Sequence, residues 1–196
     1  MLDQLKIINL ALAKLSDYNT VQSLDEPSVE AMQAKAHWDV ALQGVLTDHP
    51  WDFARRQKRL ALLSEDTSTS AYEYHYAYPV NCIIVRRVYS AREPYGNAPF
   101  AVAMSQDEKQ RIIQCNQIEA MAEFTLASPP VSTFPALFAS ALAWRIAAEI
   151  ALATGKSGAV NPIEGYAPTL DQARPRDSRA VGTRPRLESN WPKPPP

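Results

Sequence analysis

The sequence feature that most constrains the fold is a long apolar segment, "FPALFASALAWRIAAEIALA", at residues 134–153. Its apolar side chains cover most of the circumference of a helix. We expect Thr133 to cap this helix, Pro135 to lie in its first turn and Gly155 to end it. A helix that is apolar nearly all round must be surrounded by other elements. The segment therefore predicts a core helix packed among others.

Two further helices are predicted before residue 50. The first, over residues 3–17, carries an apolar stripe at helical spacing made of Leu5, Ile8, Leu12 and Leu15. The second is expected to begin at Asp25 as a capping residue, with Pro27 in its first turn. It should end near residue 47, because the residue before Pro50 avoids the helical conformation.

From residue 53 to 127 short runs rich in β-branched and aromatic residues replace the helical period, among them "CIIVRRVY", "FAVAM" and "RIIQC". Over residues 118–126, apolar side chains alternate with Glu119, Met121, Glu123 and Thr125. This alternation predicts a half-buried strand. Because the connections are short, we expect an antiparallel meander.

The C-terminal part differs in composition from the rest. Residues 160–196 hold 8 of the 16 prolines, and residues 171–196 carry 6 basic and 3 acidic side chains against 14 and 18 in residues 1–170. Residues 161–180 could hold a broken helix, interrupted at Pro168 and stopped at Pro175. Residues 181–196 have no period, which is typical of an extended arm or a disordered tail.

Together these patterns predict an α+β fold. It is mainly an α-helical bundle of three to four helices, with a small antiparallel β-rich insertion and an extended C-terminal arm. The bundle is expected over residues 1–52 and 132–158, the insertion over 53–131 and the Pro/Arg-rich arm over 159–196.

Four aromatic residues are predicted to act as structural anchors: Trp38, Trp51, Phe53 and Trp144. In "DHPWDFARRQKRL", residues 48–60, Trp51 and Phe53 follow the end of the second helix and precede the β-rich runs. Aromatic side chains bury large areas at such a boundary. We expect these two to hold the bundle against the insertion.

Composition excludes several classes of protein. A formal net charge of −1 excludes a polycation that coats nucleic acid. Cys82 and Cys115 lie far apart and outside any CxxC pattern, so free thiols in a reducing compartment are expected. The N-terminus lacks the marks of a signal peptide, and no window approaches the ~18 consecutive apolar residues of a membrane span. We expect a soluble protein made in the cytoplasm, with no membrane partner.

No motif indicates catalysis or a metal. "ATGKSG", at residues 153–158, ends like a phosphate-binding loop, but Ile150 replaces the first glycine and a helix precedes it instead of a strand. His37, His49 and His75 share no ligand spacing. The spacing of the carboxylates singles out no pair for acid–base work. We therefore expect no enzyme activity, no cofactor and no metal site.

Two clusters leave alternatives open. Tyrosines at every second position would share one face of a strand, either as a stacking platform for bases or as a packed or subunit-facing surface: Tyr72, Tyr74, Tyr76 and Tyr78. Nearby cations could contact phosphates or form the rim of a subunit interface: Arg55, Arg56, Lys58 and Arg59. The acidic balance of residues 1–170 favours packing or a subunit-facing surface for the tyrosines, and for the cations a solvated strand or an interface rim is the commoner case.

The arm carries its cations in "RPR" units followed by one aromatic residue: Arg174, Arg176, Arg179, Arg184, Arg186 and Trp191. The planar guanidinium suits bidentate contacts with acidic grooves of a protein partner. A passive disordered tail is the alternative interpretation.

The order of these pieces resembles the head-to-tail adaptor (connector) proteins of short-tailed bacteriophages, the group that includes tail tubular protein A. Three segments carry the resemblance: "HPWDFARRQKRLAL", "YAYPVNCIIVRRVY" and "FPALFASALAWRIAAEIA". It covers about residues 3–155, and "YAPTLDQARPRDSRA" beyond them only weakly. This chain departs from the family pattern at Pro168 and Pro175, where relatives tend to keep a longer last helix.

The resemblance implies a non-enzymatic virion protein at the head–tail junction. Copies would form a ring, usually of twelve, between the portal protein and the tail nozzle protein, and would lengthen the DNA channel. An acidic lumen would repel the phosphates, so DNA passes without sequence-specific binding. The resemblance also implies that the arm reaches along the portal. A small nucleic-acid-binding protein, using the tyrosine strand and the arginine clusters, is the alternative.

Overall fold

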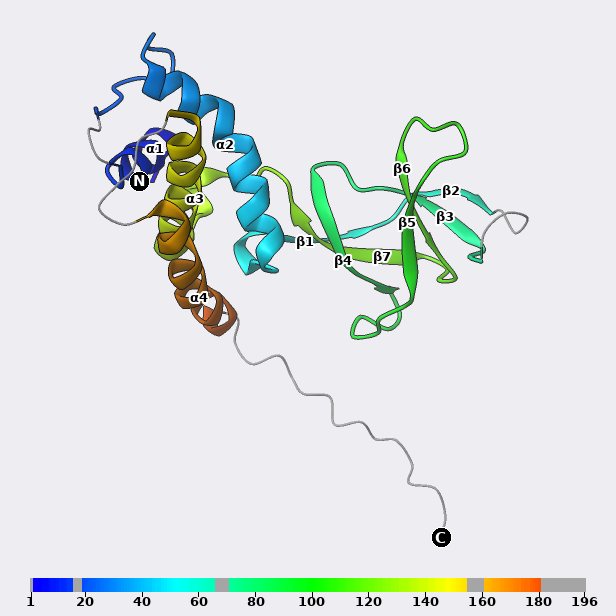
Figure 1. Cartoon of the computed structure of the whole chain (residues 1–196). Coiled ribbons are helices and arrows are strands. Elements are labelled where there is room, and N and C mark those ends of the chain that lie inside the picture. Colours follow the sequence, from blue (N-terminus) through cyan, green and yellow to red (C-terminus); the bar gives the residue numbers. More distant parts are fainter. Residues whose placement is uncertain (1, 16–18, 66–70, 155–160, 181–196) are drawn as a thin grey trace.

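A computed structural model describes residues 2–15, 19–65, 71–154 and 161–180 of the chain. Over these residues the chain is a mixed α and β protein with four helices and two antiparallel sheets. The helices lie together, and the strands lie beyond one end of helix α2 (Val29–Asp48) (Figure 1).

The other helices are α1 (Gln4–Leu12), α3 (Ala136–Thr154) and α4 (Pro162–Ala180). Asp3 caps α1, which ends short of the expected residue 17. Ser28 caps α2 by accepting a hydrogen bond from the Ala31 N–H at 3.2 Å. The predicted cap at Asp25 is therefore wrong, and that carboxylate pairs with Lys35 at 3.1 Å instead.

The start of α3 also differs from the expectation. Thr133 belongs to a 3₁₀ turn, Val131–Thr133, and its hydroxyl donates to the Pro130 carbonyl at 2.7 Å. The carbonyl of Pro135 accepts the first helical hydrogen bond, from the Ala139 N–H at 3.0 Å. Proline therefore precedes the helix here, and threonine holds the turn before it. The predicted end at Gly155 lies outside the described residues.

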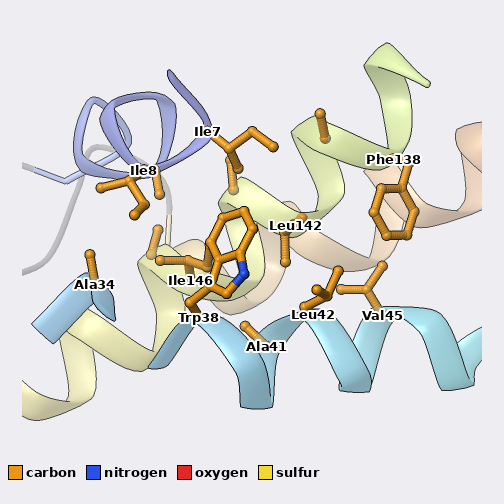
Figure 2. Close-up of a cluster of buried hydrophobic side chains, with 14 of the residues drawn as sticks. Ile7, Ile8, Ala34, Trp38, Ala41, Leu42, Val45, Phe138, Leu142 and Ile146 are labelled. Atoms are coloured by element: carbon orange, nitrogen blue, oxygen red, sulfur yellow. The ribbon is translucent and has the colours of Figure 1, made fainter. Parts of the chain in front are cut away.

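Helix α3 lies at the centre of the helical part and contacts the other three helices, as its apolar sequence predicts. Figure 2 shows Trp38 of α2 beside Leu142 and Ile146 of α3, with Ile7 and Ile8 contributed by α1. The predicted anchor Trp38 is thus confirmed as a core residue. By length and composition Ala136–Ala153 could cross a membrane, and half of this window is buried inside the protein.

Helix α4 corrects the prediction of an extended arm over residues 159–196. Residues 162–180 are helical although Pro168 and Pro175 lie inside the helix. Both prolines are exposed and seven positions apart, so they share the outer face of α4. Leu170 and Ala173 are buried in the helical core, on the face that contacts α3. The carbonyls that lose a hydrogen-bond partner belong to Glu164 and Asp171, which are also exposed, and access to water lowers the cost of each break.

Seven strands form the two sheets: β1 (Arg55–Arg59), β2 (Leu62–Glu65), β3 (Tyr74–Ala77), β4 (Cys82–Ser90), β5 (Phe100–Met104), β6 (Arg111–Cys115) and β7 (Ala120–Leu126). One sheet has the order β1-β7-β4 and the other β2-β3-β6-β5. The antiparallel prediction is confirmed, but β1 pairs with β7, so the topology is no simple meander. The chain leaves the helices at β1 and returns at β7, which brings its first and last strands together.

The sheets enclose a second core, built from both of them and including Tyr76, Val88, Ile113 and Phe124. The chain passes from β1 directly into β2, and a bridge joins Val88 to Ala98, just before β5. The two sheets are therefore connected at both of these positions. Strand β7 lies in the middle of its sheet.

The predicted half-buried character of β7 needs correction. Ala120, Ala122 and Phe124 face the core as expected, but Glu123 and Thr125 on the opposite face are also buried. Polar side chains from β1 and β4, together with the end of α2, cover that opposite face. An alternating sequence cannot reveal such a second cover.

Candidate functional site

The end of α2 is the place where the helices and the sheets meet. Trp51 follows it and is 1% exposed, and its indole N–H donates to the Val45 carbonyl at 2.8 Å. This bond satisfies one of the carbonyls that the last helical turn leaves without a partner. The ring packs edge-on against Phe138 of α3 at 5.0 Å between centroids. Trp51 therefore joins the end of α2 to α3.

Phe53 extends this aromatic cluster. Its ring lies 4.7 Å from that of Phe138 and 5.5 Å from that of Phe134. Phe53 belongs to the short 3₁₀ turn Asp52–Ala54, which leads directly into β1. Edge-to-face aromatic pairs of this kind add to the energy of area burial. Trp51 and Phe53 thus pack with the helical core directly before β1 begins, and their predicted role in holding the sheets stays a prediction.

Arg86 of β4 makes the other connection across this junction. The register of β4 on β7 shifts between Val85 and Arg87, which is the signature of a β-bulge. A bulge re-aims the side chain that it contains. Arg86 donates to the carbonyls of Leu46, Thr47 and His49 at 3.1–3.2 Å. A cation from the sheet thus caps the negative end of the α2 dipole.

A second contact of Arg86 fixes its direction. Its Nε donates to the Thr125 hydroxyl of β7 at 3.1 Å. Thr125 is 1% exposed, so the guanidinium passes over a buried part of the sheet before it reaches the helix. Sequence reasoning missed this residue, although two adjacent arginines inside the apolar run "CIIVRRVY" are a signal that could have found it.

Helix α4 joins the junction through Asp177. Its carboxylate accepts a hydrogen bond from the Asp52 N–H at 3.0 Å and lies 3.4 Å from Nε2 of His49. Burial raises the pKa of Asp177, and the Asp52 hydrogen bond opposes this shift. Burial lowers the pKa of His49, and the negative charge of Asp177 offsets this shift only in part. Each group is therefore harder to ionise here than in water.

Tyr166 supplies a further contact between α4 and the end of α2. Its hydroxyl donates to the Asp48 carboxylate at 2.6 Å. Burial, and then this carboxylate, raise the pKa of Tyr166 well above its ordinary value. The phenol stays protonated and acts as a hydrogen-bond donor. More than 110 positions separate these partners in the sequence, so no local pattern could have paired them.

A polar network covers the opposite face of the β1-β7-β4 sheet. Glu123 accepts from Gln57 at 2.9 Å and from Arg87 at 3.1 Å. Burial alone would raise the pKa of Glu123, but the Gln57 hydrogen bond and the Arg87 charge outweigh it, and the pKa is lowered. Arg87 also donates to the carbonyls of Pro94 and Gly96 and so holds the loop before β5.

The predicted interface cations lie on β1. Arg55 approaches Asp52 at 3.4 Å, and Arg59 pairs with Glu119 at 2.6 Å. Arg56 and Lys58 are exposed. Two of the four cations are thus engaged within the chain, and an interface role for the cluster stays a prediction.

The four tyrosine side chains of this segment are buried or half-buried rather than exposed. Tyr76 is 2% exposed, and its hydroxyl donates to the Gln117 carbonyl at 2.7 Å. Tyr74 shares its face, which is the face of the sheet core. Burial raises the pKa of Tyr78 to about 12, and the Arg111 guanidinium lies over its ring at 4.1 Å. Tyr72 is half-buried outside the strand. This geometry favours packing over a stacking platform.

The arm residues divide between two regions. Arg174 donates to Asp171 at 3.2 Å and to the Asp48 carbonyl at 3.4 Å, and Arg176 is exposed. Arg179 lies in α4. The remaining three lie outside the described residues: Arg184, Arg186 and Trp191.

Trp144, the last predicted anchor, lies where α3 meets α4. A Cβ added to Gly165 would come within 2.7 Å of the indole ring. The ammonium of Lys14 lies 4.0 Å from the ring centroid on another side. Glycine is therefore the residue that lets α4 approach α3 so closely.

Among the described residues no group of three or more His, Cys, Asp or Glu side chains could hold a metal. A pocket of about 280 Å³ lies beside Trp51, Phe138, Ala173 and Asp177 and is mainly apolar. Its one buried carboxylate is already bonded to the Asp52 N–H. This arrangement can stiffen the junction, and it presents no positioned nucleophile.

A scan against models of known protein families gives no match, and a search of curated proteins finds no relative of the chain.

Proposed function

We propose that this chain is a head-to-tail adaptor protein of a short-tailed bacteriophage, organised as a helical bundle with a β-rich insertion. One observation carries the proposal. The three segments on which the resemblance rests contribute the side chains of a single junction. Trp51 and Phe53 come from the first segment, Arg86 from the second, and Phe134 and Phe138 from the third.

The junction suits a structural protein that transmits force between its helical and β parts. Aromatic contacts, a helix cap from the sheet and hydrogen bonds from α4 all converge on residues 45–53. Because these contacts come from distant parts of the chain, the two parts resist rotation about α2. A protein that transmits force between a capsid vertex and a tail needs such stiffness. A non-enzymatic role fits this use of the polar groups.

Exposed apolar side chains support assembly into a ring. On the outer side of α2, Val29, Met32 and Val40 are exposed at helical spacing, with Ala36 between them. Apolar patches of this kind mark protein contacts. We propose a ring of twelve copies that binds the portal protein on one side and the tail nozzle protein on the other, inside the virion.

The charge distribution supports a DNA channel without DNA binding. Residues 1–170 carry 14 basic and 18 acidic side chains, so the ring as a whole would repel phosphates. The proposal also shortens the portal-binding arm. Since α4 is docked through residue 177, the arm begins after residue 180 and contains Arg184, Arg186 and Trp191.

The test mixes the purified chain with the portal protein encoded in the same genome. Sedimentation velocity and negative-stain electron microscopy should show a ring docked under the portal. Deletion of residues 181–196 should abolish docking and leave the thermal melting of the chain unchanged. The matched control replaces Arg92 and Lys109, both exposed in loops of the β part, by Gln and should dock normally.

Two results would count against the proposal. One is the absence of any portal complex at concentrations up to tens of micromolar. The other is tight, salt-dependent binding of the isolated chain to DNA, which would favour the nucleic-acid-binding alternative. The burial of Tyr76 speaks against that alternative, because a buried ring cannot stack on a base.

A further inference from the structure

The sheet β2-β3-β6-β5 has two apolar edges. Strand β5 reads "FAVAM" and carries no charge, and β2 begins with Leu62 and Leu63, both exposed. Among the described residues no strand pairs with the outer side of either, apart from the bridge at Ala98, which precedes β5. Monomeric proteins protect such edges with lysine, proline or a covering element. Neither edge has lysine or proline, and Glu65, the last residue of β2, is the one charged residue in these two strands.

The register shows that the apolar core continues to both edges. Leu62 pairs with Tyr76, Tyr76 with Ile113, and Ile113 with Val102, so these four side chains form one row on the inner face. The two central members are buried, whereas Leu62 is 49% exposed and Val102 is 45% exposed. The row therefore begins and ends with apolar side chains in contact with water.

Strand direction makes the two edges complementary. Neighbouring strands are antiparallel throughout this four-stranded sheet, so β2 and β5 run in opposite directions. A second copy, rotated about an axis parallel to the strands, would place its β2 antiparallel to β5 of the first. The contact is heterologous, and it can repeat around a closed ring.

A pocket beside β2 fits the side chains of an incoming strand. It has a volume of about 310 Å³ and is lined by Leu60, Leu62, Tyr74, Tyr76 and Ile118. The ion pair between Arg59 and Glu119 lies at its rim. An apolar floor with a charged rim is the usual anatomy of a protein contact site.

We propose that copies of this chain associate head to tail through β5 of one copy and β2 of the next, with Val102 opposite Leu62. The inference deepens the ring assembly of the proposed function and rests on it for closure. Copies in a closed ring are related by rotation alone, without a shift along the ring axis. The side-chain row of one copy therefore lies level with the same row of the next copy. One strand pair buries less than the ~1,200 Å² of a stable interface, so single contacts are weak and closure strengthens them.

Disulfide cross-linking tests the pairing directly. Leu62→Cys and Val102→Cys are introduced together, and the protein is oxidised at high concentration. Within one chain the two positions lie on opposite edges, about 14 Å apart at ~4.8 Å per strand, too far for a disulfide. Across the proposed contact the Cα atoms would be ~4.5–5.5 Å apart, which a disulfide can bridge. Both native cysteines are buried, and burial raises the pKa of their thiols, so they do not compete.

The expected result is a ladder of covalent oligomers that reaches beyond the dimer. The matched control pairs Val102→Cys with Val80→Cys, because Val80 is 87% exposed but lies away from β2. It should give no ladder. Equal ladders from both variants, or none from the test variant, would overturn the inference.

A charge variant provides an independent measurement. Val102→Lys should weaken self-association by about tenfold or more, because the ammonium would be desolvated in the contact. Val80→Lys should leave it unchanged, and both variants should melt like the parent chain. A ladder without portal binding would refute the adaptor function and leave this pairing intact. Docked rings that tolerate Val102→Lys would refute the pairing alone.

Discussion

The helical and β parts of the molecule differ in how their cores end. The helical core is surrounded by its own elements, and its largest side chains, such as Trp51, Phe138 and Ile146, are fully buried. The core between the sheets is smaller, and its apolar rows reach water at β2 and β5. The helices therefore bury the largest side chains of their core among themselves, whereas the rows of the sheet core end in apolar side chains that another chain could cover.

The junction explains how the β part, whose core is less completely buried, is held against the helices. Arg86 attaches the sheets to the end of α2 with hydrogen bonds, while the aromatic cluster on the helical side is apolar. Hydrogen bonds fix direction, and apolar burial supplies most of the free energy. Mutations on the two sides should accordingly differ in size and in kind.

Trp51→Ala should have the largest effect and tests whether the helical core is the more completely buried of the two. Loss of a fully buried indole, with its hydrogen bond to Val45, should lower the free energy of unfolding by about 3–5 kcal/mol. Leu62→Ala, at a half-exposed edge, should lower it by less than about 1 kcal/mol. Urea unfolding followed by far-UV circular dichroism measures both. Similar losses for the two variants would contradict the contrast between the cores.

Arg86→Leu should uncouple the two parts. It removes the donors to three carbonyls at the end of α2 and should cost about 2–4 kcal/mol. Because the contact crosses the junction, thermal melting should separate into two transitions. Arg92→Leu, at an exposed position in the following loop, is the matched control and should melt in one step. A single, unshifted transition for Arg86→Leu would show that the aromatic cluster suffices.

Sequence reasoning succeeded where the cause was local or periodic. The central apolar helix and the antiparallel strands follow from periodicity, and the end of α2 follows from Pro50 after it. Residues 162–180 were predicted at most as a helix broken at Pro168 and Pro175, because proline is judged by its neighbours in sequence. Here Pro168 and Pro175 share an exposed face, and the opposite face is stabilised by α3.

The polar side of the site could not be predicted for a different reason. Asp177 and His49 lie 128 positions apart, and a bulge sets the direction of Arg86. The partners of both depend on tertiary placement, so even the adjacent arginines in "CIIVRRVY", which single out Arg86, do not show that it reaches the end of α2. An alternating strand such as β7 likewise cannot show that its polar face is covered. The general lesson is that buried polar contacts need the fold before they can be assigned.

Two glycines allow a tightly packed and an open position of the helices to be compared. Gly165→Ala would place a Cβ within 2.7 Å of the Trp144 ring and should cost about 1–3 kcal/mol by forcing α4 away from α3. Gly44→Ala in α2 meets nothing within 4 Å and should gain about 0.5–1 kcal/mol from helix propensity. Urea unfolding of both variants measures the difference. Replacement of Trp144 by Leu should recover part of the Gly165→Ala loss, and a failure to do so would place the strain elsewhere.

Glu123→Gln should give the smallest change and one that depends on pH. The folded pKa of Glu123 lies below its ordinary value of 4.5, so the carboxylate stabilises the fold above that pH. This contribution is lost as the pH falls through the folded pKa. At pH 7 the variant should be less stable than the parent by about 1–2 kcal/mol, and the gap should shrink below pH 4.5. Urea unfolding at pH 7, 5 and 4 measures this gap, with the exposed Glu73→Gln as the matched control. A gap that stays constant with pH would mean that the hydrogen bonds from Gln57 and Arg87, rather than the charge of Glu123, hold this face of the sheet.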